Sequence, residues 1–366
     1  MVGLGVASAL VGLLACGELR TAPSAGADSG AGGDGDGVDV GDAGGSRDGT
    51  VDATGAADAS DAAADVSSVD AGDPCRVAAL DAGATDLEWA MWPLPPAAPD
   101  GGSYAVQSGV VCDRTTKLAW ERSVGSVRSW DEAKTYCDTL SVGGYTDWRL
   151  PTRIELLSIV DYGRDVPAIN VTAFPGTLVQ VVTDGGPPDD EYWTATPRSI
   201  LSGRRFVVGF NYGQAYDIVM TPPHAVRCVR GGAPANSNQG ITYLATANTA
   251  LDPRTGLRWQ RGEVAGSPTT WAAALQACQT LQLDGYSGFS LPTMRELESL
   301  YDVRATTGPL WDKAAFSAPN ATIAAAQLWS SNEAGADALL LSFIPGESMF
   351  GQAKTSYAGA RCVKRP

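Results

Sequence analysis

The chain has 366 residues, of which 44% are hydrophobic, so it is long enough for two domains or more. Its formal net charge is −15, and residues 17–74 alone account for −11, so the remainder is close to neutral. This distribution excludes the basic surface that nucleic-acid binding requires, and we expect no nucleic-acid partner.

The first sixteen residues are typical of an exported protein. Residues 2–14 are an apolar run too short to cross a bilayer but long enough for a signal-peptide core. The run ends in Leu13-Leu14-Ala15-Cys16, which resembles a bacterial lipoprotein processing site. The resemblance implies that Cys16 carries a lipid as the only membrane attachment, in the cell envelope at the outer membrane or cell surface. An ordinary secretory signal is the alternative, and the lack of Lys or Arg before the run leaves the true start codon open.

Residues 17–74 consist mainly of Gly, Ala, Asp, Ser and Thr, with almost no large apolar side chains. Such a segment cannot bury enough surface to offset its ordering entropy, so we expect a disordered acidic tether that charge repulsion keeps extended. The spacing of its Asp residues does not match a calcium-binding loop. Residues 75–102, which include Trp89 and Trp92, are expected to be a lead-in segment that packs on the first domain.

The rest of the chain contains one domain twice. Five landmarks recur in the same order about 140 residues apart: a turn that leads to Trp120 or Trp259, a Trp-headed stretch with a Cys, Leu-Pro-Thr-x-x-Glu-Leu, a Trp followed by Thr or Ser, and Arg-Cys-Val. A period of this length is the size of a domain rather than of a solenoid repeat. We expect a first domain at 103–232, a linker at 233–239 and a second domain at 240–366.

The pattern within each copy predicts an α+β fold, with helices early and an antiparallel sheet late. Thr152 with Glu155, and Thr293 with Glu296, have the spacing of a capping box that begins a helix. A third capping box, at Ser129, predicts a helix from Trp130 that presents Cys137 on its apolar face. Apolar or alternating runs at 205–210, 215–220, 225–230 and 338–344 are expected to be strands.

Seven cysteines are present, and removing Cys16 leaves six, an even number that suits an exported protein. Corresponding positions in the two copies predict two bridges, and the remaining pair would join the lead-in segment to the first domain: Cys137–Cys228, Cys278–Cys362 and Cys75–Cys112. Catalytic thiols are the weaker alternative, because no Cys-x-x-Cys or neighbouring His motif is present.

Four motifs carry a family resemblance: Trp-x-Glu-Ala-x-x-x-Cys, Gly-Gly-Tyr-x-Asp-Trp-Arg-Leu-Pro-Thr-x-x-Glu-Leu, Tyr-Trp-Thr and Val-Arg-Cys-Val. Together they resemble the family of unknown function that forms the C-terminal domain of the Legionella collagen-like adhesin, over residues 104–232 and 243–364. More distantly, a helix Cys bridged to a final-strand Cys resembles the C-type lectin fold, which includes formylglycine-generating enzymes. The resemblance implies two tandem C-type-lectin-like domains and, in at least one member, binding of sulfated polysaccharide at the cell surface.

The second copy departs from the motif at Phe289-Ser290, where the first has Trp148-Arg149. We expect Trp148 in the core and an ion pair between Arg149 and Glu155. Ser290 cannot make that pair, so we expect it to be missing from the second copy.

A cluster of arginines in the first copy is the predicted ligand site. Forked guanidinium groups grip sulfate or carboxylate, and tyrosine rings stack on sugars. The candidate ligand-binding residues are Arg198, Arg204, Arg205, Tyr212 and Tyr216. Packing in turns and sheets is the more ordinary explanation for the two tyrosines.

Other candidate chemistry is sparse. His224 is the single histidine, so a His-based triad or His-ligated metal is not expected, and a loop or edge position is favoured for it. The acidic stretch Asp184, Asp189, Asp190 and Glu191 could hold calcium, but a solvated loop is favoured. We expect no cofactor and no resident metal.

These patterns favour a lipid-anchored surface protein that binds a polysaccharide or another surface protein without catalysis. A relative of formylglycine-generating enzymes and a structural envelope or assembly protein are the alternatives. The sequence leaves the ligand, the oligomeric state and any binding by the second domain open.

Overall fold

The computed structural model describes residues 104–366 except 165, 179–189, 199–202, 232–241, 306, 318–325 and 347. The predicted signal peptide, tether, lead-in segment and linker at 233–239 therefore lie outside the described residues. The two domains belong to one compact unit. Among the described helices, none has the length and apolar character needed to cross a membrane.

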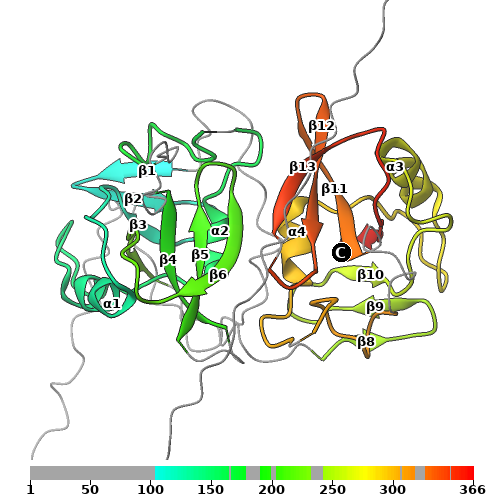
Figure 1. Ribbon diagram of the computed structural model, residues 1–366, viewed down its shortest axis with the longest axis horizontal. Helices are drawn as coiled ribbons and strands as arrows, with labels where there is room; N and C mark the ends of the chain where they lie inside the picture. The colour runs from blue at the N-terminus through cyan, green and yellow to red at the C-terminus, as the bar shows by residue number, and fades with distance from the viewer. Residues whose placement is uncertain are drawn as a thin grey trace, which may run out of the picture. The chain divides into compact units, whose positions relative to one another are not determined.

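The first domain has two short helices and two antiparallel sheets (Figure 1). One sheet has the order β1-β2-β3-β7 and the other the order β4-β5-β6. In chain order the elements are β1 Tyr104–Gln107, β2 Val110–Asp113, β3 Ala119–Glu121, α1 Trp130–Thr139, α2 Arg153–Ser158, β4 Glu191–Pro197, β5 Arg204–Gly209, β6 Gln214–Val219 and β7 Val229–Arg230.

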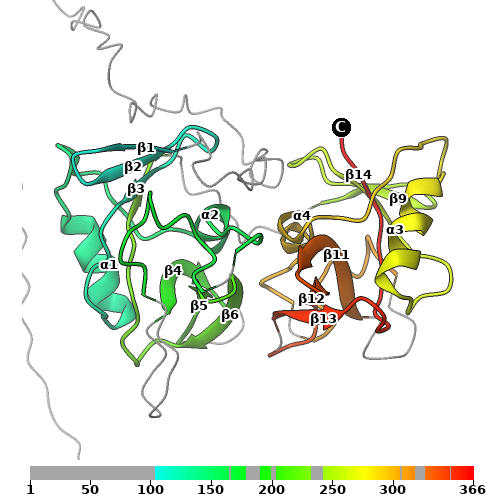
Figure 2. The ribbon, with the colours of Figure 1, turned by 90° about the horizontal axis from the view of Figure 1, so that it is seen from above.

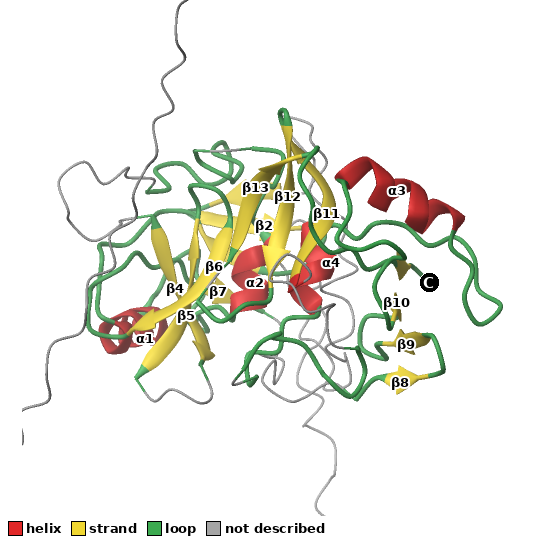
Figure 3. Cartoon of the chain, turned by 45° about the vertical axis from the view of Figure 1, so that its right-hand side comes forward, coloured by secondary structure: helices red, strands yellow, loops and turns green. Residues whose placement is uncertain are grey.

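The second domain repeats this order, with sheets β8-β9-β10-β14 and β11-β12-β13 (Figure 2). Its elements are β8 Leu244–Ala245, β9 Thr249–Leu251, β10 Arg258–Gln260, α3 Trp271–Thr280, α4 Met294–Ser299, β11 Gln327–Ala334, β12 Asp337–Ser342, β13 Met349–Ala353 and β14 Val363–Lys364. Strands outnumber helices in both copies (Figure 3). The α+β class and the tandem duplication are confirmed.

Both Leu-Pro-Thr motifs begin a helix as predicted. The Thr152 hydroxyl accepts from the Glu155 amide at 3.3 Å, and a Glu155 carboxylate oxygen accepts from the Thr152 amide at 2.8 Å. Thr293 and Glu296 make the same pair of bonds at 3.2 and 2.7 Å. Each box satisfies two amides that a helix start leaves without partners, so the motif sets the beginning of α2 and α4.

Each of these capping glutamates is also held by an arginine. Arg149 pairs with Glu155 at 2.5 Å, as predicted. The prediction that the second copy lacks such a pair is wrong, because Arg365, near the end of the chain, pairs with Glu296 at 2.7 Å and donates to the Ser290 hydroxyl. A residue distant in sequence has replaced the arginine that Ser290 displaced.

The cores form around buried tryptophans and the predicted disulfides. Trp120 in β3 and Trp259 in β10 are fully buried, and Trp148 is a core residue. Disulfides join Cys137 in α1 to Cys228, and Cys278 in α3 to Cys362. Each bridge lies inside its own apolar cluster, so it fastens the long helix to the last part of its domain.

Residues 225–230 do not form the continuous strand that their apolar pattern predicts. Only Val229–Arg230 is a strand, β7, which pairs with β3. Val229 also bridges Arg149, and two residues before β7 make isolated bridges to other segments, His224 with Arg128 and Ala225 with Tyr192. The segment is apolar because several elements cover it, and it crosses between them rather than following one partner.

The domains meet through α2 and α4. The Arg153 guanidinium forms an ion pair with Glu298 at 2.5 Å, with both side chains almost fully buried, and stacks 4.9 Å from the Tyr301 ring centroid. Arg295 donates to the Ser158 carbonyl at 2.8 Å in the opposite direction. The helices that the repeated motif begins therefore also join the two copies.

Candidate functional site

The predicted arginine cluster is divided between the two faces of the sheet β4-β5-β6. Successive strand residues point to opposite faces, so Arg204 and Arg205 at the start of β5 diverge. Arg204 donates to the Asp217 carboxylate and to its carbonyl, each at 2.5 Å. Arg198 is buried and donates to the carbonyls of Val303 at 3.4 Å and Ala305 at 3.0 Å. Arg198 therefore serves the contact between the domains.

The other three predicted ligand residues lie elsewhere. The Arg205 guanidinium stacks on Trp130 of α1, 4.4 Å from the ring centroid. The Tyr216 hydroxyl donates to the Glu191 carboxylate, while Tyr212 is exposed in the turn before β6. The structure does not bring the five residues together as one site, although Arg204 and Arg205 remain partly accessible.

A buried group of titratable side chains lies in the first domain around Glu191. This residue opens β4 and is buried, in contrast to the solvated loop predicted from its acidic neighbours. One carboxylate oxygen accepts from Tyr216, and the other lies 3.1 Å from His224 Nδ1. Burial raises the Glu191 pKa to about 7, against the lowering effect of the Tyr216 hydroxyl. His224 also packs edge-on against Trp193, so it is a core residue beside a carboxylate.

The second domain lacks all three members of this group. Gln327 is the first residue of β11, as Glu191 is of β4. In each domain the backbone carbonyl of this residue accepts a hydrogen bond from a backbone amide of the segment after the last loop. The register of the sheets puts Phe350 in the place of Tyr216, and the isolated bridges put Ala358 in the place of His224. The sequence analysis treated Glu191, Tyr216 and His224 separately, because they lie in three different segments of the chain.

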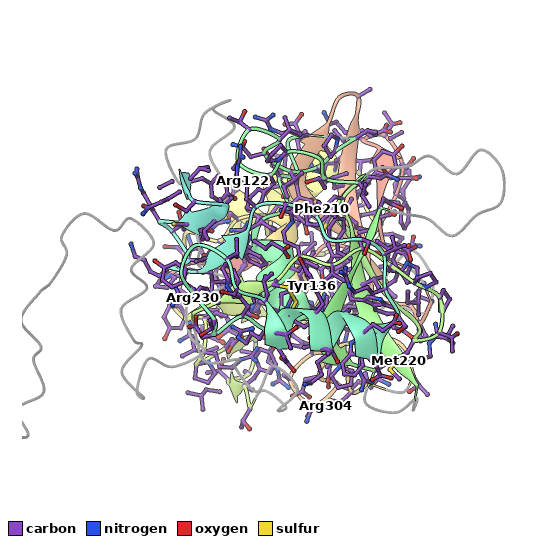
Figure 4. All side chains as sticks on the ribbon, turned by 90° about the vertical axis from the view of Figure 1, so that its left-hand side faces the viewer. Arg122, Tyr136, Phe210, Met220, Arg230 and Arg304 are labelled. Carbon is purple, nitrogen blue, oxygen red and sulfur yellow. A yellow bond between two sulfur atoms is a disulfide. The ribbon has the colours of Figure 1, made fainter. Side chains whose placement is uncertain are left out.

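A second buried carboxylate of the first domain is also replaced by an amide in the second domain. Glu121 accepts from the Cys228 amide at 3.1 Å, and Gln260 accepts from the equivalent Cys362 amide at 3.2 Å. Glu121 also accepts a short bond from Tyr136 of α1, labelled in Figure 4. Burial raises the Glu121 pKa above its ordinary value, and the Tyr136 bond opposes this. Two carboxylates of the first domain are thus amides in the second.

The arginines of the two Arg-Cys-Val motifs are fully buried. Arg227 donates to the carbonyls of Glu121 and Arg122, and Arg361 to those of Gln260 and Arg261. Each also stacks 4.8 Å from a phenylalanine ring centroid. Burial lowers the Arg361 pKa to about 10. The arginine of each motif therefore fixes the backbone where β3 or β10 ends.

Two depressions lie beside the buried Arg227 and Arg361, at equivalent places in the two domains. One of 480 Å³ is lined by Arg122 and the residues after it, and the other of 510 Å³ by Arg261 and the residues after it. The Arg122 amide donates to Gly109, and the Arg261 amide donates to Asn248, which confirms that the two arginines correspond. Arg122 was not among the predicted site residues.

The remaining cysteine and metal predictions are partly outside the structure. Cys112 is disulfide-bonded, but its predicted partner Cys75 and the lipidation residue Cys16 lie outside the described residues. Asp184 and Asp189 of the acidic stretch are also outside them, and Asp190 is buried. Among the described residues, no group of three or more His, Cys, Asp or Glu is placed to hold a metal.

Comparison with known families gives a match to both domains. The model of the Lcl C-terminal domain matches residues 109–230 and again residues 248–364. The two matched segments fall on the two structural copies. No curated protein matches the chain.

Proposed function

Because this chain belongs to the Lcl C-terminal domain family, we propose that it is a non-catalytic, adhesin-like surface protein that binds polysaccharide. The observation that carries the proposal is the double family match, which covers both copies of the domain. A resemblance to an adhesin domain supports recognition of a surface ligand rather than chemistry on a substrate.

The polysaccharide is expected to be anionic. Sulfate and carboxylate groups are recognised by guanidinium forks, and Arg204 and Arg205 are partly accessible at one end of the first domain's sheet. Arg204 is already paired with Asp217, so its contribution to binding is smaller than that of an unpaired arginine.

The lipid anchor at Cys16 is part of the same proposal. An acidic spacer between a lipidated residue and folded domains would hold those domains away from the membrane. The test is metabolic labelling with a fatty acid in wild type and in Cys16→Ser, together with protease accessibility of whole cells. Equal labelling of the two proteins would remove the anchor from the proposal.

Binding is tested with purified full-length protein and immobilised dextran sulfate, with dextran as the uncharged control. We expect salt-sensitive retention on dextran sulfate alone, because exposed charge pairs are screened by salt. An Arg204→Ala/Arg205→Ala variant measures how much of the retention on dextran sulfate depends on these two arginines. Absence of retention at low salt would favour the structural envelope or assembly alternative.

The enzyme alternative requires a free reactive thiol. Among the described residues, the five cysteines are all disulfide-bonded, which supports a non-catalytic role. A thiol titration of the oxidised, denatured protein decides between the two. Two or more free thiols from the first domain would favour an enzyme of the formylglycine-generating type.

A further inference from the structure

The depression beside Arg122 has the features of an anion site. It lies where β3 ends and is lined by Arg122, two serines of the following loop, Ser123 and Ser126, and the Pro175–Gly176 turn. We propose that this depression binds the sulfate or carboxylate groups of an anionic polysaccharide, and that the equivalent depression of the second domain has lost this ability. The proposal deepens the proposed function and rests on it.

The Arg122 guanidinium is only weakly used by the protein itself. Among the described residues, its side chain donates only to the Thr172 carbonyl, at 3.4 Å, the long limit of a hydrogen bond. Its Nε is buried and has no hydrogen-bond partner among the residues that the structure describes. A buried donor without a partner has a desolvation cost that an incoming anion would offset. Arg122 is labelled in Figure 4.

The charges around this depression favour an anion. No Asp or Glu is among the described residues that line it. Arg128 holds the rim through a 2.6 Å bond to the Ser126 carbonyl, and Arg227 lies beneath, bonded to the Arg122 carbonyl at 3.1 Å. The nearest carboxylate in sequence, that of Glu121, is bonded to Tyr136 and the Cys228 amide. Arg122 is therefore the one guanidinium among the described lining residues, Arg128 and Arg227 hold the backbone around it, and the Ser123 and Ser126 hydroxyls add donors to the lining.

The same place in the second domain has a different arrangement of charges and hydrogen bonds. All three nitrogens of the Arg261 guanidinium donate to backbone carbonyls, at 2.7 Å to Ala315, 2.6 Å to Thr246 and 3.2 Å to Ala314. Glu263 stands where the first domain has Val124 and lines the depression, and Thr269 stands where the first domain has Arg128. Lys313 restores one positive charge, but it is bonded to Thr307.

The experiment compares two matched variants, Arg122→Gln and Arg261→Gln, in the full chain. Binding is measured by surface plasmon resonance to dextran sulfate, carboxymethyl dextran and dextran. Arg122→Gln should weaken the Kd for the charged polymers about tenfold, the value of a lost charge-assisted contact. Arg261→Gln should leave the Kd within about twofold. The two charged polymers distinguish sulfate from carboxylate recognition.

The outcomes separate the site from the function. Binding by wild type that is unchanged in Arg122→Gln but lost in Arg204→Ala/Arg205→Ala overturns the depression and leaves the proposed function in place. Equal losses in Arg122→Gln and Arg261→Gln overturn the assignment to the first domain. No binding by wild type removes the proposed function itself. Thermal melting of Arg122→Gln should match wild type, since the side chain has one weak bond to lose.

Discussion

The buried ion pair between Arg153 and Glu298 offers a strong test of how the two domains are joined. Each residue has a counterpart in the other copy: Met294 stands where α2 has Arg153, and Leu157 stands where α4 has Glu298. Residues of these types are therefore already accepted at the same helical positions. Arg153→Met removes the cation, and Arg153→Met/Glu298→Leu removes both charges.

The structure sets the expected magnitude. The Arg153 and Glu298 side chains are 3% and 2% exposed, so Arg153→Met leaves a buried carboxylate without its counterion. It also removes the bond from Arg153 to the Glu298 carbonyl and the stacking on Tyr301. Breaking one partner of such a pair destabilises by about 3–5 kcal/mol, whereas replacing both by apolar residues is often neutral or stabilising. The double variant should therefore recover most of the loss.

The assay is urea unfolding of the full chain, followed by tryptophan fluorescence, with Glu298→Leu completing the double-mutant cycle. The expected result is a large coupling energy of opposite sign to the single losses. If the double variant is as unstable as the sum of the two single variants, the pair is not the element that joins the domains. If Arg153→Met melts like wild type, the carboxylate is hydrated and the interface is not closed around it.

Three further predictions concern single domains. Glu191→Gln should raise the free energy of unfolding at pH 8 and leave it unchanged at pH 4. The raised pKa of the Glu191 carboxyl stabilises the fold below about pH 4.5, and this contribution is lost as the pH rises through about 7. The change is up to about 3 kcal/mol, and urea titrations at both pH values measure it. Cys278→Ala with Cys362→Ala should cost the second domain about 4 kcal/mol by the chain-entropy model, and a lowered Tm checks this. Arg149→Ala and Arg365→Ala should each cost about 0.5–1 kcal/mol because both pairs are partly exposed; melting of both variants at the wild-type Tm would contradict a stabilising role for these ion pairs.

The features that the sequence predicted correctly are local or repeated. Thr152 and Glu155 are three residues apart, so the capping box follows from spacing alone. The Cys137–Cys228 bridge was found because a second copy placed its cysteines correspondingly. Local spacing and duplication together predicted the α+β class and the tandem organisation.

The features that the sequence did not predict depend on distant residues. Arg153 and Glu298 are 145 positions apart, and neither copy contains both members of the pair, so no repeated pattern marks it. In the second domain Arg365 pairs with Glu296 as Arg149 pairs with Glu155 in the first. Because Arg365 is distant in sequence from the position equivalent to Arg149, the local motif does not reveal this ion pair. Glu191 was assigned to a solvated loop because acidic residues precede it, whereas a buried strand begins at that residue.

Two differences between the copies replace a buried acid of the first domain by an amide in the second. The first domain keeps Glu121 and Glu191 as buried acids, where the second has Gln260 and Gln327. A carboxylate and an amide have nearly the same shape, so the fold accepts either, but only the acid can change its charge. At these two positions only the first domain can titrate, and it also has the weakly bonded Arg122, whereas the arginine at the same place in the second domain is held by backbone carbonyls. Ligand recognition that depends on pH or salt should for this reason map to the first domain.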